Sequence, residues 1–132
     1  MAQLMTHLWS EMIGVWTLDG VAEFGADGQV RGRPYGDEPA GRLMYTRDAH
    51  MAVVISGYGP APAVAYAGHV AVDRDRVQHL VAVGLPPFSE DQERFARVED
   101  GGAVLILATD RPGNPRTELR WVRQAPQGIR TK

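Results

Sequence analysis

The sequence contains no cysteine, no long apolar run and no excess of basic charge. The lack of cysteine excludes disulfides and thiolate catalysis, and it suits a reducing compartment, so we expect a cytoplasmic protein. No apolar run approaches the ~20 residues that cross a bilayer, and the chain does not open on a signal peptide pattern, so we expect no membrane partner. With a formal net charge of −2, the chain has no basic footprint for nucleic acid.

The length of 132 residues predicts a single domain over residues 1–132, enough to enclose one core or one small cavity. Glycine (15 residues) and proline (9 residues) are frequent, which is typical of many short strands joined by tight turns. The chain shows no internal repeat and no linker. We therefore look for a β-rich fold without a second domain.

Hydrophobic spacing predicts one short helix over residues 3–12, followed only by strands. In the helix, apolar side chains recur every three or four residues: Leu4, Met5, Leu8, Trp9 and Met12. From residue 15 the period changes to two, with a possible bulge at Asp19-Gly20. Trp16, Leu18, Ala22 and Phe24 share one parity around that bulge. The remaining predicted strands are 29–33, 41–46, 50–57, 64–72, 77–83, 92–98, 103–109 and 118–124, before a loose tail over 125–132.

The hairpin over residues 41–57 has a distinctive turn at Arg47-Asp48-Ala49. A type I turn closed by a left-handed residue pairs Thr46 with His50, and the left-handed position falls on Ala49 instead of the usual glycine. This register predicts two faces. One face carries Leu43, Tyr45, Met51, Val53 and Ile55, and the other carries Met44, Thr46, His50 and Ala52.

Short strands at regular spacing predict an all-β fold, and closure into an antiparallel barrel removes exposed strand edges. Gly14-Val15-Trp16 begins the first strand and Trp121-Val122-Arg123 ends the last. An Arg guanidinium stacks favourably on an indole face, so we expect Trp16, Trp121 and Arg123 to form a barrel floor.

The segment 34–55 carries a family resemblance that extends to later strands. Its residues are Pro34-Tyr35-Gly36, Pro39-Ala40-Gly41-Arg42-Leu43, Tyr45-Thr46, Asp48 and His50-Met51. Further matches are Tyr66-Ala67-Gly68, Val72-Asp73, Val77, His79, Val81, Gln92, Arg94, Leu119, Trp121 and Arg123. On these residues the chain resembles the bacterial and fungal lipocalin-like domain family.

The resemblance implies a calycin-type barrel of eight to ten strands that binds small molecules. Barrels of this kind include carriers and some cofactor-free cyclases and isomerases, so the fold does not choose between them. The chain departs from the family at Ala49, where glycine is usual, and at residues 57–63, where the family usually has a longer insertion over the barrel mouth. The entrance is therefore expected to be more open, or covered by the N-terminal helix.

Two polar residues fall on otherwise apolar strand faces. His79 alternates with Val77, Val81 and Val83, which suits either an acid or base inside the barrel or a core histidine with a satisfied neighbour. Arg94 has the parity of Gln92, Ala96 and Val98. It either faces the interior, where it needs an anionic or carbonyl partner, or lies on a solvated outer face.

Tyr45 and Tyr66 either donate hydrogen bonds into a cavity or are amphipathic wall residues. His7, His50 and His69 are scattered, and no metal-ligand spacing or nucleotide fingerprint occurs, so we expect no metal and no cofactor. The candidate ligand-binding residues are Tyr45, Met51, Val53, Tyr66, Val77, His79, Val81 and Arg94.

These observations favour a barrel that binds a small hydrophobic metabolite and acts as a cofactor-free cyclase or isomerase of secondary metabolism. Tyr45, His79 and Arg94 are the candidate catalytic residues, which would polarise a carbonyl of the folded substrate. The alternatives are a non-catalytic binding or carrier protein with the same cavity, and a structural barrel filled by side chains. A homodimer is compatible with the pattern, but nothing in the sequence requires one.

Overall fold

The computed structural model of the protein describes residues 2–56 and 59–131. Helix α1 (Ala2–Met12) comes first, and a 3₁₀ turn, η1 (Asp100–Gly102), precedes one of the later strands. The nine strands of the described residues are β1 (Gly14–Phe24), β2 (Val30–Gly32), β3 (Ala40–Tyr45), β4 (His50–Ser56), β5 (Val64–Asp73), β6 (Arg76–Gly84), β7 (Gln92–Glu99), β8 (Val104–Ala108) and β9 (Arg116–Arg123).

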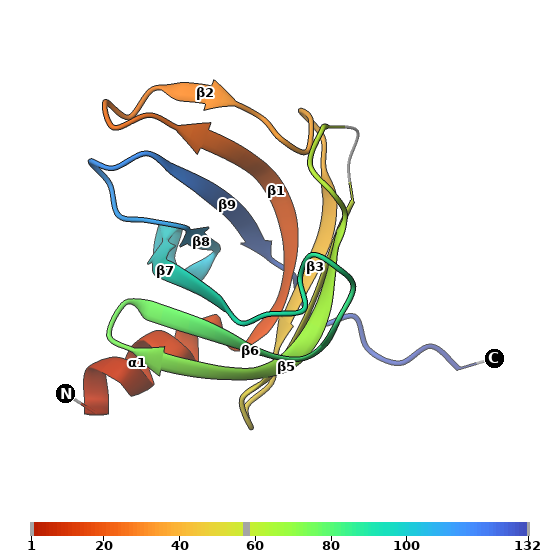
Figure 1. Cartoon of the computed structure of the whole chain (residues 1–132). Coiled ribbons are helices and arrows are strands. Elements are labelled where there is room, and N and C mark those ends of the chain that lie inside the picture. Colours follow the sequence, from red (N-terminus) through yellow and green to blue (C-terminus); the bar gives the residue numbers. More distant parts are fainter. Residues whose placement is uncertain (1, 57–58, 132) are drawn as a thin grey trace.

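The strands form one antiparallel sheet that closes on itself. Each strand from β3 to β8 pairs with the next one, and β1 pairs with both β3 and β9, so eight strands complete the ring in the described part of the chain. Strand β2 pairs with the C-terminal end of β1. Figure 1 shows the curved wall around an interior, with α1 at one end. The predicted all-β closed barrel with an N-terminal helix is confirmed.

The predicted hairpin over residues 41–57 has the expected turn and register. The Thr46 amide donates to the His50 carbonyl at 3.0 Å, and Ala49 has the left-handed φ of 68°. The predicted inward set, Leu43, Tyr45, Met51, Val53 and Ile55, is buried. The last predicted strand residue, Gly57, lies with Tyr58 outside the described residues.

Two bulges change the faces that simple alternation predicts. The register of β1 shifts against β9 between Leu18 and Gly20, so the inward positions move by one residue and Val21 is buried instead of Ala22. Phe24 consequently packs under the guanidinium of Arg116 on the outside. The pairing of β5 with β6 shifts between Ala67 and Gly68, and Val83 is 68% exposed.

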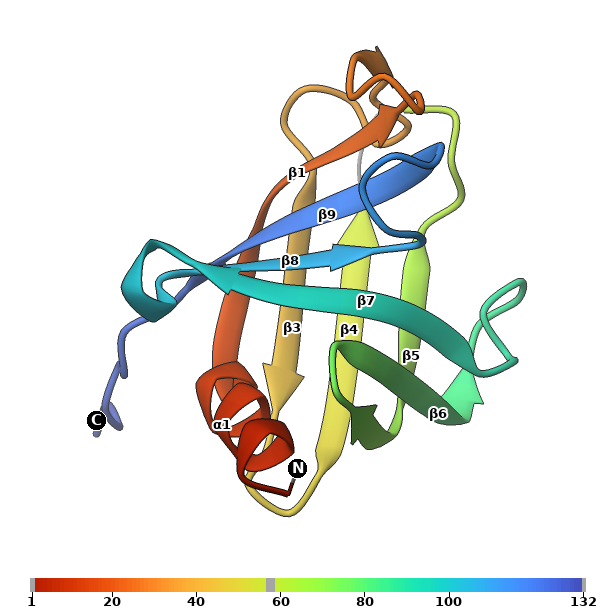
Figure 2. The same ribbon diagram turned by 90° about the vertical axis from the view of Figure 1, so that its left-hand side faces the viewer.

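The barrel floor lies at the end that α1 covers (Figure 2). The guanidinium of Arg123 stacks over the Trp16 ring at 4.2 Å, as predicted. It also donates to the carbonyls of Glu11, Ile13 and Gly102, so it ties the end of α1 and the η1 turn to β9. None of the described residues belongs to a helix long and apolar enough to cross a membrane.

Candidate ligand-binding site

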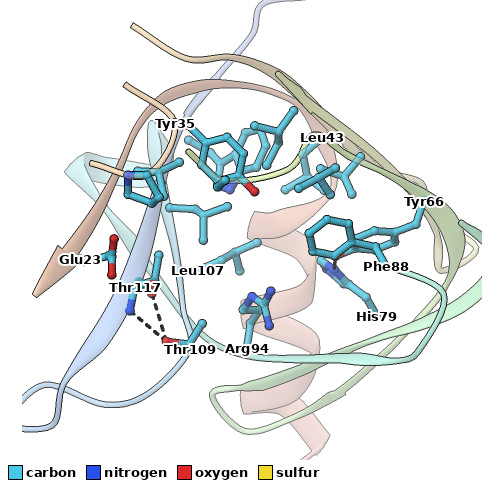
Figure 3. Close-up of a pocket in the computed structure, with 18 residues that line it drawn as sticks. Glu23, Tyr35, Leu43, Tyr66, His79, Phe88, Arg94, Leu107, Thr109 and Thr117 are labelled. Carbon is cyan, nitrogen blue, oxygen red and sulfur yellow. Dashed lines mark hydrogen bonds between the residues drawn. The ribbon is translucent and has the colours of Figure 1, made fainter. Parts of the chain in front are cut away.

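A cavity of about 290 Å³ lies inside the barrel, just below the ~300–1,000 Å³ range of ligand pockets. Its wall is largely apolar, with a few polar side chains among aliphatic ones (Figure 3). The lining residues are Val21, Glu23, Pro34, Tyr35, Leu43, Val53, Ile55, Ala61, Val64, Tyr66, His79, Phe88, Arg94, Leu107, Thr109, Thr117, Leu119 and Trp121. A small, mainly apolar molecule fits such a wall.

The cavity opens at the end opposite α1. Pro34 and Tyr35 lie in the connection from β2 to β3, Ala61 lies between β4 and β5, and Thr109 lies between β8 and β9. Of the two arrangements expected for the entrance, a cover formed by the helix is wrong, because α1 seals the floor. Ala61 belongs to the short segment 57–63, so the short connection does border the mouth.

His79 occupies the inner wall, between two tyrosines. The strand β6 alternates inward and outward, which buries Val77 and His79 and leaves Gln78 outside. The hydroxyl of Tyr45 on β3 lies 2.6 Å from Nε2 of His79, and the hydroxyl of Tyr66 on β5 lies 2.6 Å from Nδ1. The structure thus satisfies both ring nitrogens of this buried histidine with phenolic groups.

All three members of this Tyr45–His79–Tyr66 chain are neutral at ordinary pH. Burial lowers the pKa of His79 to about 3, and the nearby Arg94 charge contributes in the same direction. Burial raises the pKa of Tyr66 to about 12 and raises the pKa of Tyr45 well above its usual range, although Arg94 opposes both shifts. The three side chains are therefore joined by hydrogen bonds between neutral groups.

Arg94 faces the cavity from β7, on the inner side of the strand as one alternative had it. Its guanidinium donates to the backbone carbonyl of Glu93 at 2.7 Å and to the side-chain oxygen of Gln92 at 3.4 Å. Within residues 2–56 and 59–131, no carboxylate oxygen lies within 4.0 Å of it. Glu93 instead points outward and pairs with Arg76.

The predicted ligand-binding residues divide into two groups. Val53, Tyr66, His79 and Arg94 line the cavity. Tyr45, Met51 and Val77 are buried in the core behind that lining, and Val81 is partly buried and packs against the core. Tyr45 therefore reaches the cavity only through His79. Trp121, predicted for the floor, is buried and lines the cavity as well.

Sequence reasoning missed several lining residues near the mouth. The Tyr35 hydroxyl donates to the Pro62 carbonyl at 3.0 Å, which joins two mouth connections. Phe88 stacks on Tyr66 with ring centroids 6.4 Å apart. Both residues lie in connections without periodicity. Tyr35 belongs to the Pro34-Tyr35-Gly36 motif of the family resemblance, whereas Phe88 is only an isolated aromatic in a turn-rich segment. Glu23 was hidden by the β1 bulge, which reverses its predicted face.

Comparison with known proteins agrees with this architecture. Residues 13–64 match the family described as "Lipocalin-like domain", from β1 to the first residue of β5. That segment is similar to the family, and the described strands as a whole form a closed antiparallel barrel. A solved structure described as a redesigned beta barrel matches with a TM-score of 0.50 at 12% identity, covering 89% of this chain and 95% of that chain. At that identity the match shows the fold alone.

No curated protein matches the sequence. The barrel fold and the match of residues 13–64 to a lipocalin-like domain suggest small-molecule binding, in agreement with the cavity.

Proposed function

We propose that this lipocalin-like barrel binds a small, largely apolar metabolite that carries a carbonyl group, and converts it by cofactor-free cyclisation or isomerisation. The observation that carries the proposal is the Tyr45–His79–Tyr66 chain, which ends at the wall of an apolar cavity. Such a chain presents one oriented hydrogen-bond donor to a bound molecule. Most of the remaining wall offers only shape.

The number of N–H and O–H donors determines which way the Tyr45–His79–Tyr66 hydrogen bonds point. A neutral imidazole has one N–H donor and one acceptor nitrogen, so one tyrosine donates to it and the other accepts from it. Tyr45 is fully buried, and its hydroxyl has no partner but His79 among the described residues. Tyr45 must therefore donate to Nε2, because an unused buried O–H is costly. Nδ1–H then donates to Tyr66, whose own O–H remains free to point into the cavity.

Tyr66 and Arg94 together suit a substrate carbonyl whose oxygen gains negative charge in the transition state. A fixed donor and a fixed cation in a mainly apolar site stabilise that charge without reorganisation. Neutral His79 and Tyr66 are weak bases and poor nucleophiles, which disfavours hydrolysis by these groups. Restricting a flexible substrate within the small cavity contributes further to a ring closure or bond shift.

The test is mass spectrometry of an apolar metabolite extract incubated with the purified protein. Cyclisation and isomerisation conserve the molecular formula, so a compound should decline while another of identical mass appears at a different retention time. The protein-bound fraction is analysed separately. A compound enriched there with unchanged mass and retention time identifies a carrier and contradicts the catalytic part of the proposal.

The Tyr66→Phe variant then tests the role of the donor. Loss of one oxyanion donor typically reduces kcat ~10²–10³-fold. We expect a reduction of about 10²-fold in kcat, with substrate affinity changed less than tenfold. Ser56→Ala, which removes an exposed hydroxyl at the end of β4, is the control and should retain full turnover. Full turnover in Tyr66→Phe would refute the assigned role.

A further inference from the structure

Arg94 brings a positive charge to the cavity, and no acidic side chain among the described residues forms an ion pair with it. Its hydrogen bonds in the described chain go to neutral acceptors on its own strand, the Glu93 carbonyl and the Gln92 amide oxygen. A guanidinium has five N–H donors, so donors remain for another group. Figure 3 shows the guanidinium directed into the space between Leu107 and His79.

Three titratable groups of the described residues share the cavity with this charge and are neutral. Tyr35, Tyr66 and His79 line the same cavity as Arg94. Burial raises the pKa of both tyrosines and lowers the pKa of His79 to about 3, and the Arg94 charge acts on all three groups. Burial keeps the two tyrosines protonated and the imidazole unprotonated. The inner wall therefore carries a net positive charge among apolar side chains, where a cation gains most from an anionic partner.

The acidic residue that lines the cavity does not neutralise Arg94. Glu23 lies at the mouth beside Thr117, on the side of the cavity away from His79 (Figure 3). It is exposed, and its carboxylate lies beyond the 4.0 Å of an ion pair with Arg94. Its charge is therefore solvated, and it disfavours an anion lodged at the entrance. An anionic group is favoured only at the inner wall.

We propose that the ligand is an amphipathic organic anion. Its charged oxygen atoms, from a carboxylate or an ionised enol, pair with the Arg94 guanidinium and accept the hydrogen bond of Tyr66. Its apolar body lies against Leu43, Val53, Ile55 and Leu107. This inference rests on the proposed binding function and specifies the class of molecule that the cavity takes.

Two fluorescent probes that share one aromatic scaffold test whether the cavity prefers an anion separately from whether it binds a small molecule at all. 8-Anilinonaphthalene-1-sulfonate carries an anionic group, and N-phenyl-1-naphthylamine is the same scaffold without it. Decanoate and decanol form a second pair, whose binding is measured by displacement of the naphthylamine. This pair is needed because the sulfonate probe can fail to bind when its bulky group does not fit the cavity. We expect the anionic member of at least one pair to bind about tenfold more tightly, as for a charge-assisted hydrogen-bonded pair.

The Arg94→Gln variant should lose this preference while keeping the neutral probe. Retained naphthylamine binding shows that the variant still folds around its cavity. Arg94→Lys keeps the charge without the planar fork and should keep part of the preference. Arg42→Gln removes a positive charge from the exposed outer face of β3 and should behave as wild type, which controls for net charge.

The outcomes are distinguishable. If both neutral compounds bind but neither anion is preferred, or if Arg94→Gln keeps the preference, the anionic ligand class is wrong and the apolar cavity remains. If no probe of either pair enters the protein, the proposed binding function itself fails.

Discussion

Burial of His79 in its neutral form should make the folded protein sensitive to mild acid. The folded-state pKa of about 3 lies below the ordinary value of 6.5. Between these values the unfolded chain binds a proton that the folded protein excludes. The contribution of neutral His79 to the free energy of unfolding is therefore fully present above pH 6.5 and is lost as the pH decreases toward 3.

The magnitude follows from the same two values. Each pH unit within this window removes about 1.4 kcal/mol from the free energy of unfolding. A change from pH 7 to pH 5 crosses roughly one and a half units of the window, so the loss is about 2 kcal/mol. Most carboxylates titrate below pH 5 and contribute little in this range. His79 is the one buried histidine among the four, since the other three are exposed, so the pH dependence between pH 7 and pH 5 is assigned to His79.

Urea unfolding at pH 7 and pH 5 measures this loss in wild type and two variants. His79→Gln keeps a donor and an acceptor between the tyrosines but cannot titrate, so its loss should be below about 0.5 kcal/mol. His69→Gln, on the outer face of β5, should retain the wild-type loss. An equal pH dependence in wild type and His79→Gln would refute the reasoning, whatever the absolute stability of the variant.

Two further predictions concern the floor and the β3–β4 turn. Arg123→Met removes three hydrogen bonds to carbonyls and the stack on Trp16. Thermal or urea unfolding should therefore show that the free energy of unfolding decreases by about 2–4 kcal/mol. A decrease below about 1 kcal/mol would contradict the role of Arg123 in holding α1 against the barrel. Ala49→Gly should raise the free energy of unfolding by about 0.5–1 kcal/mol, because Ala49 holds a left-handed φ of 68°. The matched control Ala103→Gly, at a φ of −79°, should be destabilised by a similar amount, and a loss of stability in both variants would show that strain at Ala49 is negligible.

The barrel was predictable because its signals are local. Alternation over β3 and β4 fixes which side chains face inward, and the turn at Ala49 fixes how the two strands pair. Trp16 and Arg123 were predictable as a pair because both lie at strand ends and their chemistries are complementary. Together these local features determine the wall and the floor of the barrel.

The arrangement of the site was less predictable, because it depends on pairings between distant strands. Tyr45 and His79 are 34 residues apart and meet only after the barrel closes. The bulges near Gly20 and Gly68 each reverse a strand face, which brings Glu23 to the cavity and turns Val83 outward. A bulge is set by twist and closure of the whole sheet, so alternation along one strand does not reveal its consequences.

Tyr66 can donate into the cavity only if Nδ1 of His79 carries the proton and donates to the Tyr66 oxygen. Long-range ¹⁵N–¹H NMR of the histidine side chains reports this directly. We predict a protonated Nδ1 and an unprotonated Nε2, with no titration of His79 between pH 5 and pH 8. A proton on Nε2 would reverse the direction of the Tyr45–His79–Tyr66 hydrogen bonds, and a second proton gained within that pH range would leave His79 without an acceptor nitrogen. Either result would contradict the assignment of Tyr66 as the donor.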